Sequence, residues 1–247
     1  MSYIKDKVIV VTGASGGIGK ATAEHLAKEG AKVVLAARNE KELHGIVQEI
    51  EGNGGVASFK ATDISSRDEV SALIDFTIEK YGRVDTLINN AGLMLFSKWD
   101  NAHVDEWEKM IDLNLKGVLY GIAAVLPQMK KQGSGQIINV GSVAGHAVGE
   151  GHGVYSATKY ATRAITESLR KEISVNHNIQ AVYVSPGVIA TNWQEKVTDK
   201  DVSSVLGNLN EVAIAPEHVA ETIAFAVNKP SNVMINDVFV TPTRQEW

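Results

Sequence analysis

Two patterns of apolar and polar positions alternate along the whole chain. Short apolar runs rich in Val and Ile predict strands near residues 7–12, 32–36, 56–61, 86–89, 136–140, 180–185 and 233–240. Helical patterns lie between these runs, among them 40–51, 104–131 and 154–175. Strands that alternate with helices are typical of right-handed crossovers and a parallel sheet. We therefore predict one α/β domain over residues 1–247, without a linker or an internal repeat.

The first predicted strand runs directly into a glycine-rich turn. Residues 13–19 read Gly-Ala-Ser-Gly-Gly-Ile-Gly, and a helical pattern follows that ends at Gly30. Strand, glycine turn and helix are the context of a dinucleotide-binding fingerprint, because glycines allow close approach to the pyrophosphate and the helix N-terminus offers free N–H groups. The alternative is a glycine turn without a ligand, and the context favours binding. The expected contacts are Gly13, Ser15, Gly16, Gly17, Ile18 and Gly19.

The end of the second predicted strand bears on the choice of nucleotide. An NAD site places an acidic side chain there for the ribose 2′-hydroxyl, whereas this sequence reads Ala36-Ala37-Arg38. A guanidinium suits a 2′-phosphate, because its planar fork can bind two phosphate oxygens. The alternative role of Arg38 is to cap the loop before the next helix. The pattern favours NADP, with Ala37 and Arg38 as contacts.

A tyrosine and a lysine stand four residues apart in a helical pattern, at Tyr155 and Lys159, with Ser142 thirteen positions before the tyrosine. Residues at this spacing share one face of a helix. A neighbouring cation lowers the pKa of a phenol, and a tyrosine tuned in this way can exchange a proton with a substrate oxygen. Ser142 would give that oxygen a second hydrogen bond. The alternative is a partly buried tyrosine beside a solvated lysine.

Composition narrows the class of protein. The chain has no cysteine, which excludes disulfides and thiolate chemistry, and no cluster of carboxylates and histidines has metal-site spacing. The net charge of −5 is spread along the sequence, which argues against nucleic acid as a partner. We see no N-terminal signal region and no long apolar span, so we expect a cytoplasmic protein that does not associate with a membrane.

Together these motifs resemble the single-domain branch of the short-chain dehydrogenase/reductase family, over nearly the whole chain. The resemblance implies a Rossmann-type, doubly wound parallel sheet of seven strands in three α/β/α layers. The positions that match the family's motifs are the glycine turn, Asp63 with Ile64, Asn90-Ala91-Gly92, Asn114, Ser142, Tyr155, Lys159, Pro186-Gly187 with Val188, and Thr191.

The resemblance also implies the chemistry. Hydride passes between NADP(H) and a carbonyl or alcohol carbon, while Tyr155 gives the proton and Ser142 bonds the oxyanion. Lys159 holds the nicotinamide ribose and lowers the pKa of Tyr155. Asn114 binds a water that links Lys159 to solvent, or else is a structural hydrogen-bonder. Asp63 lies beside the adenine, and Thr191 binds the carboxamide. The helices at 104–131 and 154–175 are expected to pair across a two-fold axis in a homotetramer.

One departure from the family bears on the substrate. Many members end their last strand in Asp-Gly-Gly, whereas this chain reads Asn-Asp-Val-Phe-Val-Thr-Pro-Thr-Arg over residues 236–244. That ending is similar to 3-hydroxy-acid (serine-type) dehydrogenases and to related aldehyde and ketone reductases. We expect a carbonyl reductase that also runs as an alcohol dehydrogenase. The alternatives are a 3-hydroxy-acid dehydrogenase, a 3-oxoacyl thioester reductase, or a catalytically silent NADP-binding regulator.

Loops at the carboxyl ends of the strands should build the substrate pocket. Its expected residues are Met94, Val143, Ala144, His146, Glu150, Ile189 and Trp193. His146, Glu150 and His152 are the polar exceptions there, and exposed loop residues are the alternative reading of all three. The polar stretch 188–215 is expected to be a substrate lid, because long connections of this kind are often functional.

Overall fold

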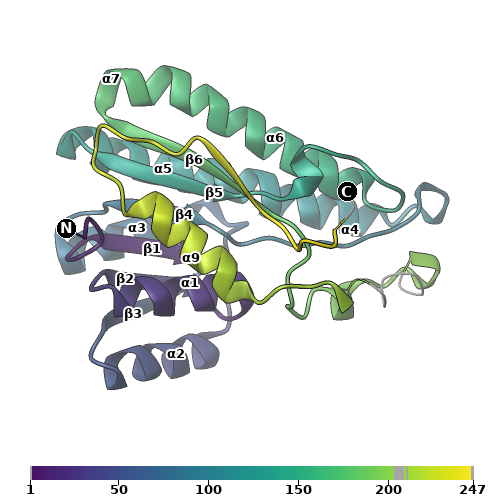
Figure 1. Cartoon of the computed structure of the whole chain (residues 1–247), viewed down its shortest axis with the longest axis horizontal. Coiled ribbons are helices and arrows are strands. Elements are labelled where there is room, and N and C mark those ends of the chain that lie inside the picture. The colour runs from purple at the N-terminus through teal and green to yellow at the C-terminus, as the bar shows by residue number, and fades with distance from the viewer. Residues whose placement is uncertain (1, 203–208, 210, 246–247) are drawn as a thin grey trace.

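The computed structural model describes residues 2–202, 209 and 211–245. A seven-stranded sheet runs through the molecule in the order β3-β2-β1-β4-β5-β6-β7, and every pair of neighbours is parallel (Figure 1). The strands are β1 (Val8–Thr12), β2 (Lys32–Ala37), β3 (Val56–Ala61), β4 (Thr86–Asn89), β5 (Gly135–Val140), β6 (Ile179–Pro186) and β7 (Asp237–Val240). The predicted doubly wound α/β fold is confirmed.

The chain reverses its direction of winding at β1. The strands β2 and β3 add on one side of it, and β4 then returns to pair with its other edge. Val10 accordingly lies between Val34 of β2 and Leu87 of β4. Such a switch point leaves a crevice at the carboxyl ends of the strands, which is where ligands bind in open α/β sheets.

Helices cover both faces of the sheet and give the three layers (Figure 1). Leu26 and Ile223 belong to the core on one face, and Leu73 and Val125 to the core on the other. Because both faces are covered, the inner strands are apolar at nearly every position. The first layer holds α1 (Gly17–Lys28), α2 (Glu40–Gly52) and α9 (Pro216–Val227), and the second holds α3 (Arg67–Tyr81), α5 (Gly117–Gln132) and α6 (Gly153–Leu169).

The predicted helix at 104–131 is continuous but changes its pitch near the middle. It consists of α4 (Val104–Ile111), a π turn over Asp112–Lys116, and α5. This stretch of 29 residues is long and apolar enough to cross a membrane by length and composition, which corrects the prediction of no long apolar span. Its buried side chains, among them Val118 and Met129, pack against the sheet, so it is a core helix of the domain.

Short helices lie in the loops that surround the carboxyl ends of the strands. They are η1 (Trp99–Asn101), η3 (Val143–Gly145) and η5 (Gln194–Lys196), while a second π turn (Arg170–Ser174) and α7 (Val175–His177) continue α6.

The last strand is shorter than predicted, since it begins at Asp237 rather than near residue 233. Side chains replace the missing strand pairing. The amide of Gln180 donates to the Val233 carbonyl over 2.8 Å, and the Ala181 N–H points at the sulfur of Met234.

Candidate active site

The glycine turn between β1 and α1 is shaped for close contact with a ligand backbone. Gly13 and Gly17 both have positive φ, at 65° and 52°. A Cβ at Gly19 would lie 2.3 Å from the Gly13 carbonyl oxygen, so no larger residue fits there. Nothing lies within 4 Å of the corresponding position at Gly16, which is the N-cap of α1 and is open. The turn thus presents the positive end of α1 to a space where a pyrophosphate can approach.

Side chains from β1 and β4 hold this turn in place. The Thr12 hydroxyl donates to the Ile88 carbonyl and accepts from the N–H groups of Asn90 and Ala91. The Asn90 amide donates to the carbonyls of Thr12 and Gly13, at 2.9 and 3.3 Å. The segment 89–91 therefore supports the glycine turn from the neighbouring strand.

The end of β2 and the loop after β3 frame the far end of this crevice. Arg38 follows β2 and is exposed. The Asp63 carboxylate accepts from the N–H and the hydroxyl of Ser65, and these bonds, with a smaller effect of Arg38, lower its pKa. Ile64 is buried, in contact range of the Gly117 backbone.

Ser142, Tyr155 and Lys159 come together at the carboxyl end of β5. Ser142 begins η3, where its hydroxyl accepts from the Ala144 N–H over 3.1 Å. Tyr155 and Lys159 lie on one face of α6, with the Lys159 ammonium 5.6 Å from the centre of the Tyr155 ring. That ammonium donates to the Val140 carbonyl over 3.0 Å, and all three side chains are buried.

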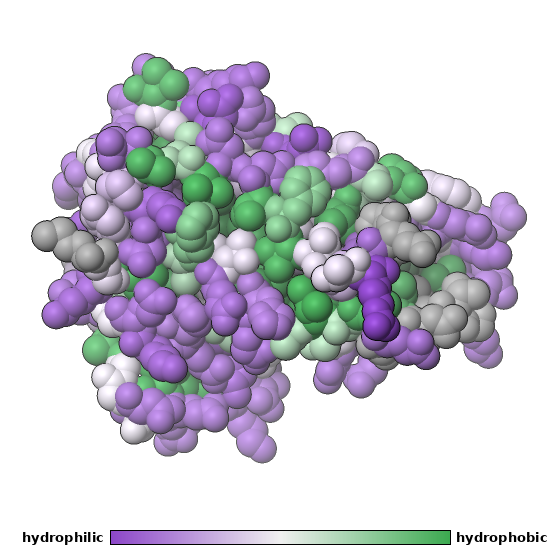
Figure 2. All heavy atoms as spheres, in the orientation of Figure 1, coloured by the Kyte–Doolittle hydropathy of each residue, from purple (hydrophilic) through white to green (hydrophobic). Residues whose placement is uncertain are grey.

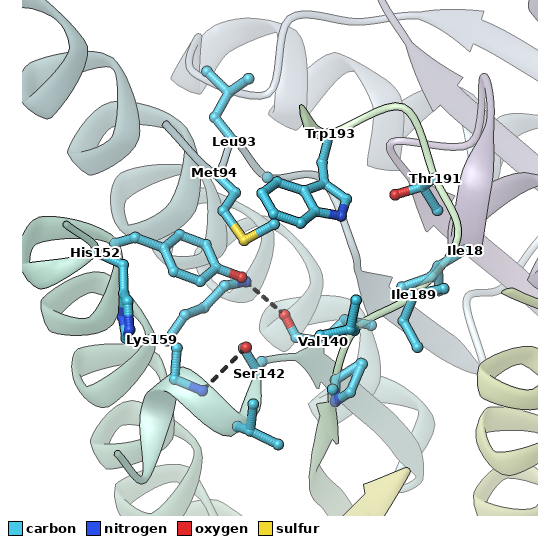
Figure 3. A pocket seen from close by; sticks show the side chains of 18 of the residues that line it. Ile18, Leu93, Met94, Val140, Ser142, His152, Lys159, Ile189, Thr191 and Trp193 are labelled. Atoms are coloured by element: carbon cyan, nitrogen blue, oxygen red, sulfur yellow. Dashed lines mark hydrogen bonds between the residues drawn. The ribbon is translucent and has the colours of Figure 1, made fainter. Parts of the chain in front are cut away.

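A cavity of 180 Å³ opens beside these three residues. Figure 3 shows Trp193 and Met94 on one side of it, with Ser142 and Lys159 opposite. Three aromatic rings meet at Phe96, which lies 5.9 Å from Tyr155 and 5.6 Å from Trp193 between ring centres. The wall is thus mostly apolar, and the polar groups converge where Tyr155 and Ser142 end.

Comparisons with known proteins agree with this geometry. A model of the short chain dehydrogenase family matches residues 7–202. The chain belongs to the short-chain dehydrogenase family. It is 48% identical to an uncharacterized oxidoreductase of Staphylococcus saprophyticus over 246 residues, 99% of both chains.

Two solved structures share the fold over nearly their full length. One is an alcohol dehydrogenase of the archaeon Thermococcus sibiricus complexed with 5-hydroxy-NADP, with a TM-score of 0.87 and 27% identity, covering 98% of this chain and 99% of that one. The other is the closed form of serine dehydrogenase complexed with NADP⁺, with a TM-score of 0.89 and 29% identity, covering 97% and 96%. This short-chain dehydrogenase is therefore an oxidoreductase.

Most of the residues predicted for the site of this short-chain dehydrogenase line its cavity or the glycine turn. From the predicted cofactor and catalytic sets the cavity wall includes Ile18, Asn90, Gly92, Ser142, Tyr155, Lys159, Pro186, Gly187, Val188 and Thr191. From the predicted substrate set it includes Met94, Val143, Ala144, Ile189 and Trp193.

Two residues predicted for the substrate pocket lie elsewhere. His146 turns away behind η3, where its Nε2 lies 2.9 Å from the Ser185 hydroxyl and its ring packs 4.4 Å from the Phe239 ring. Glu150 is exposed and forms an ion pair with Lys98 at 3.4 Å. Proximity in sequence to a catalytic residue did not place either of them, because His146 packs toward β6 and β7 and the side chain of Glu150 faces solvent.

His152, which the sequence gave little weight, does line the cavity. Its Nδ1 lies 2.7 Å from the Ser156 hydroxyl, its ring is 5.2 Å from that of Phe96, and burial lowers its pKa. Lys196 and Leu209 also belong to the wall, from the segment after β6. The sequence could have indicated His152, because it stands three residues before Tyr155, at the N-cap of α6. Lys196 gave no such indication, since only the path of its loop brings it to the cavity.

The side chain of Asn114 is occupied within the protein. Its carbonyl accepts from the Leu93 N–H at 2.7 Å, and its amide donates to the Leu93 carbonyl and to the Thr158 hydroxyl. The amide thus joins the π turn, the loop after β4 and α6. These bonds give the side chain a structural role, and the water relay to Lys159 stays a prediction.

The electrostatics of the buried pair differ from expectation. Burial raises the pKa of Tyr155 to about 12, against the effect of a hydrogen bond to Ser142, and burial lowers the pKa of Lys159 to about 8. Loss of solvation outweighs the hydrogen bond to Ser142 in setting the tyrosine pKa, and a lowering of that pKa by Lys159 stays a prediction. Tyr155 is a neutral phenol at pH 7.

The buried ammonium gives a prediction for stability. With a pKa of about 8 folded and 10.5 unfolded, Lys159 binds more protons in the unfolded state between these values, so its contribution to stability rises with pH there. Relative to Lys159→Met, the free energy of unfolding of the native protein should increase by up to about 3 kcal/mol between pH 8 and pH 10.

Urea unfolding of both proteins, at the same protein concentration and over this pH range, measures this difference. The raised pKa of Tyr155 has the opposite effect on stability, and it cancels because both proteins contain Tyr155. A difference between the two proteins that stays constant over this range would contradict the prediction.

Proposed function

We propose that this short-chain dehydrogenase is an NADPH-dependent reductase of aldehydes or ketones, which also runs in reverse as an alcohol dehydrogenase. The observation that carries the direction is the state of Tyr155. A phenol with a pKa of about 12 carries its proton at neutral pH, so the proton that reduction consumes is in place, whereas the reverse reaction has to begin from a phenolate. Reduction needs that donation, because the carbonyl oxygen gains negative charge as hydride arrives at the carbon.

The residues present fit a dinucleotide. The open Gly16, the positive φ of Gly13 and Gly17 and the start of α1 form a cradle that a Cβ would fill at Gly19. Lys159 and Thr191 lie where the nicotinamide end would enter the cavity, and Asp63 and Arg38 lie at the opposite end. When bound, the cofactor supplies the hydride. The solved structures of two relatives in complex with NADP or its hydroxylated form support this assignment.

The chain's own residues then divide the remaining chemistry. Ser142 and Tyr155 lie on the same side of the cavity, where both hydroxyls can bond one substrate oxygen. Tyr155 gives its proton to that oxygen, and Ser142 stabilises the developing charge. The Lys159 ammonium, fixed by the Val140 carbonyl, faces the tyrosine ring and favours the phenolate that remains. The apolar wall around Phe96 excludes water from the step.

Tyr155→Phe tests the role of the phenol. The variant keeps the ring and its contacts with Phe96 but loses the proton donor, so kcat should fall by at least a factor of about 1,000, which corresponds to about 4 kcal/mol of barrier. NADPH binding, followed by fluorescence titration, should stay within about twofold of the native value. Retention of more than a tenth of the native kcat would exclude Tyr155 as the proton donor.

Arg38 tests the preference for NADPH. Arg38→Leu combined with Ala37→Asp removes the guanidinium from the end of β2 and installs a carboxylate that repels a 2′-phosphate and accepts from a 2′-hydroxyl. We expect KM for NADPH to rise at least tenfold and KM for NADH to fall. Arg67→Leu, which removes an exposed charge from the same edge of the sheet, is the matched control and should change neither value. Equal KM values for the two cofactors in the native protein would contradict the assignment.

A 3-hydroxy acid is the second candidate substrate, and Lys196 is the observation that favours it. This lysine places a cation at the wall of an otherwise apolar cavity, where a carboxylate could bind. One of the similar structures is named a serine dehydrogenase. Assays of NADPH absorbance with ketones, aldehydes, 3-hydroxy acids and 3-oxoacyl thioesters separate these candidates. The intact Ser142, Tyr155 and Lys159 disfavour a catalytically silent regulator.

Assembly into a homotetramer is part of the proposal. The helices predicted to pair carry exposed apolar or aromatic residues, which are Ile111 on α4, Leu119 on α5 and Tyr160 on α6. Other apolar residues of these helices lie in the core, among them Val118, Ile122 and Val125. Figure 2 shows another apolar area, across the middle of the face in view. Phe225 and Phe239 are more than half exposed. Exposed apolar areas of this kind mark interaction surfaces.

Light scattering at micromolar concentration should therefore give a mass of four chains. Leu119→Glu or Phe225→Glu should reduce the mass to that of a smaller assembly, because each places a charge on an apolar surface. Lys41→Glu on α2, far along the chain from both areas, should leave it unchanged. A monomeric native protein would contradict this part of the proposal.

The cytoplasmic location stays a prediction. So does a substrate lid at 188–215, of which residues 203–208 and 210 lie outside the described part of the chain.

A further inference from the structure

The segment that follows β6 forms one wall of the cavity and is fixed at its near end. The Ile214 N–H donates to the Val188 carbonyl, and the Ala190 N–H donates to the Ile214 carbonyl at 2.8 Å. This bridge lies beside Thr191, whose methyl group approaches Gly17 of the cofactor cradle. The part of the segment next to the cofactor cradle is thus fixed by the hydrogen bonds between residues 188–190 and Ile214.

The next described stretch, 192–198, carries the residues that face the substrate side. Trp193 and Lys196 line the cavity, and Val197 is buried in the apolar cluster that contains Tyr155 and Phe96. Nothing in this stretch pairs with a strand of the sheet among the described residues. Its position therefore depends on what holds its far end.

Asp199 holds that far end. Its side chain is almost completely buried, at 2% exposure, and both carboxylate oxygens accept hydrogen bonds. One oxygen accepts from the N–H groups of Asp201 and Val202, at 2.9 and 3.3 Å, as an N-cap residue does. The other accepts from the Lys98 N–H and the Asn101 amide, both at 2.9 Å.

The second oxygen reaches a loop about a hundred residues away in sequence. That loop, 97–101, is in turn bound to the turn before Tyr155, because the Ser97 N–H donates to the Gly151 carbonyl at 2.8 Å. Val202 lies against the same turn, 3.2 Å from the position of a Cβ on Gly151. A helix cap needs only one oxygen, so the bonds to Lys98 and Asn101 serve to join the two segments.

We propose that Asp199 is a positioning residue for substrate, whose carboxylate fixes the stretch that carries Trp193 and Lys196 against the loop beside Tyr155. The proposal rests on the proposed reductase function. A carboxylate suits the task because it only accepts, and here four N–H donors converge on it. With one end released, the stretch 192–198 would keep its bridge at Ile214 but lose its fixed distance from Tyr155. Substrate affinity then falls, while cofactor affinity, set by the cradle and the bridge, stays.

Asp199→Asn is the central variant. An amide offers one acceptor oxygen, so one pair of donors loses its partner while the size of the side chain is kept. Asp201→Asn is the matched control, since it removes the same charge from the same turn, leaves the four bonds of Asp199 in place and keeps an oxygen that can accept from the Asn101 amide, which lies 3.2 Å from the Asp201 carboxylate. We expect Asp199→Asn to raise KM for the best carbonyl substrate at least tenfold, with kcat within threefold and the Kd of NADPH within twofold. The control should match the native protein.

Hydrogen exchange gives a readout that does not depend on turnover. In Asp199→Asn the amides of 97–101 and 196–202 should exchange at least tenfold faster than in Asp201→Asn, without any substrate present. If the native protein reduces no carbonyl in the assay, the reductase proposal fails, and this exchange result still decides whether Asp199 joins the two segments. Should Asp199→Asn not fold, Asn101→Ala removes one donor and leaves the helix cap, and an approximately threefold rise in KM is expected.

Three results would overturn the proposal. One is an unchanged KM in Asp199→Asn, or in Asn101→Ala where the first variant does not fold. Another is an equal rise in KM and in the Kd of NADPH, which indicates a general structural role. The third is an effect of the same size in Asp201→Asn, which assigns the change to charge alone.

Discussion

Parallel pairing of all seven strands is the constraint from which the site follows. Because every strand runs the same way, the segments after β1, β4, β5 and β6 emerge at one edge of the sheet. The glycine turn, Asn90, Ser142 and Thr191 are far apart in sequence and come together only for this reason. The return of the chain from β3 to β4 beside β1 adds the crevice into which they point. A change of strand order would scatter the same residues without altering any local motif.

The buried ionisable groups of the site also lower the stability of the fold. Lys159 is a buried ammonium that donates to the Val140 carbonyl, and its lowered pKa reflects how unfavourable that buried charge is. Tyr155 beside it resists losing its proton for the same reason. Burial thus acts on the two groups in opposite senses, and both shifts reduce the amount of charge held in the cavity. Active sites that use such groups are commonly less stable than an apolar core would be.

Local spacing predicted much of this, and longer-range geometry accounts for what it missed. The Tyr155–Lys159 pair and the glycine turn depend on helix pitch and on backbone freedom, which short sequences encode directly. His146 and His152 look alike in sequence, yet one packs behind η3 on Phe239 and the other lines the cavity, because the turn between them reverses the chain. The pKa of Tyr155 depends on burial among residues from other parts of the chain, such as Phe96 and Val197, which no spacing within α6 reveals. Asp199 was visible only as one polar residue in a polar stretch.

The bonds of Asn90 and Thr12 to the glycine turn have a consequence for how quickly a nucleotide can bind. They give the turn its shape from the protein alone, since the Asn90 amide satisfies the carbonyls of Thr12 and Gly13, and the Thr12 hydroxyl accepts from the N–H groups of Asn90 and Ala91. A ligand that meets a finished cradle loses its own freedom but does not have to order the receptor, so less of the contact energy is consumed on binding. Association at this end should then be limited by diffusion and orientation rather than by a slow rearrangement of the loop.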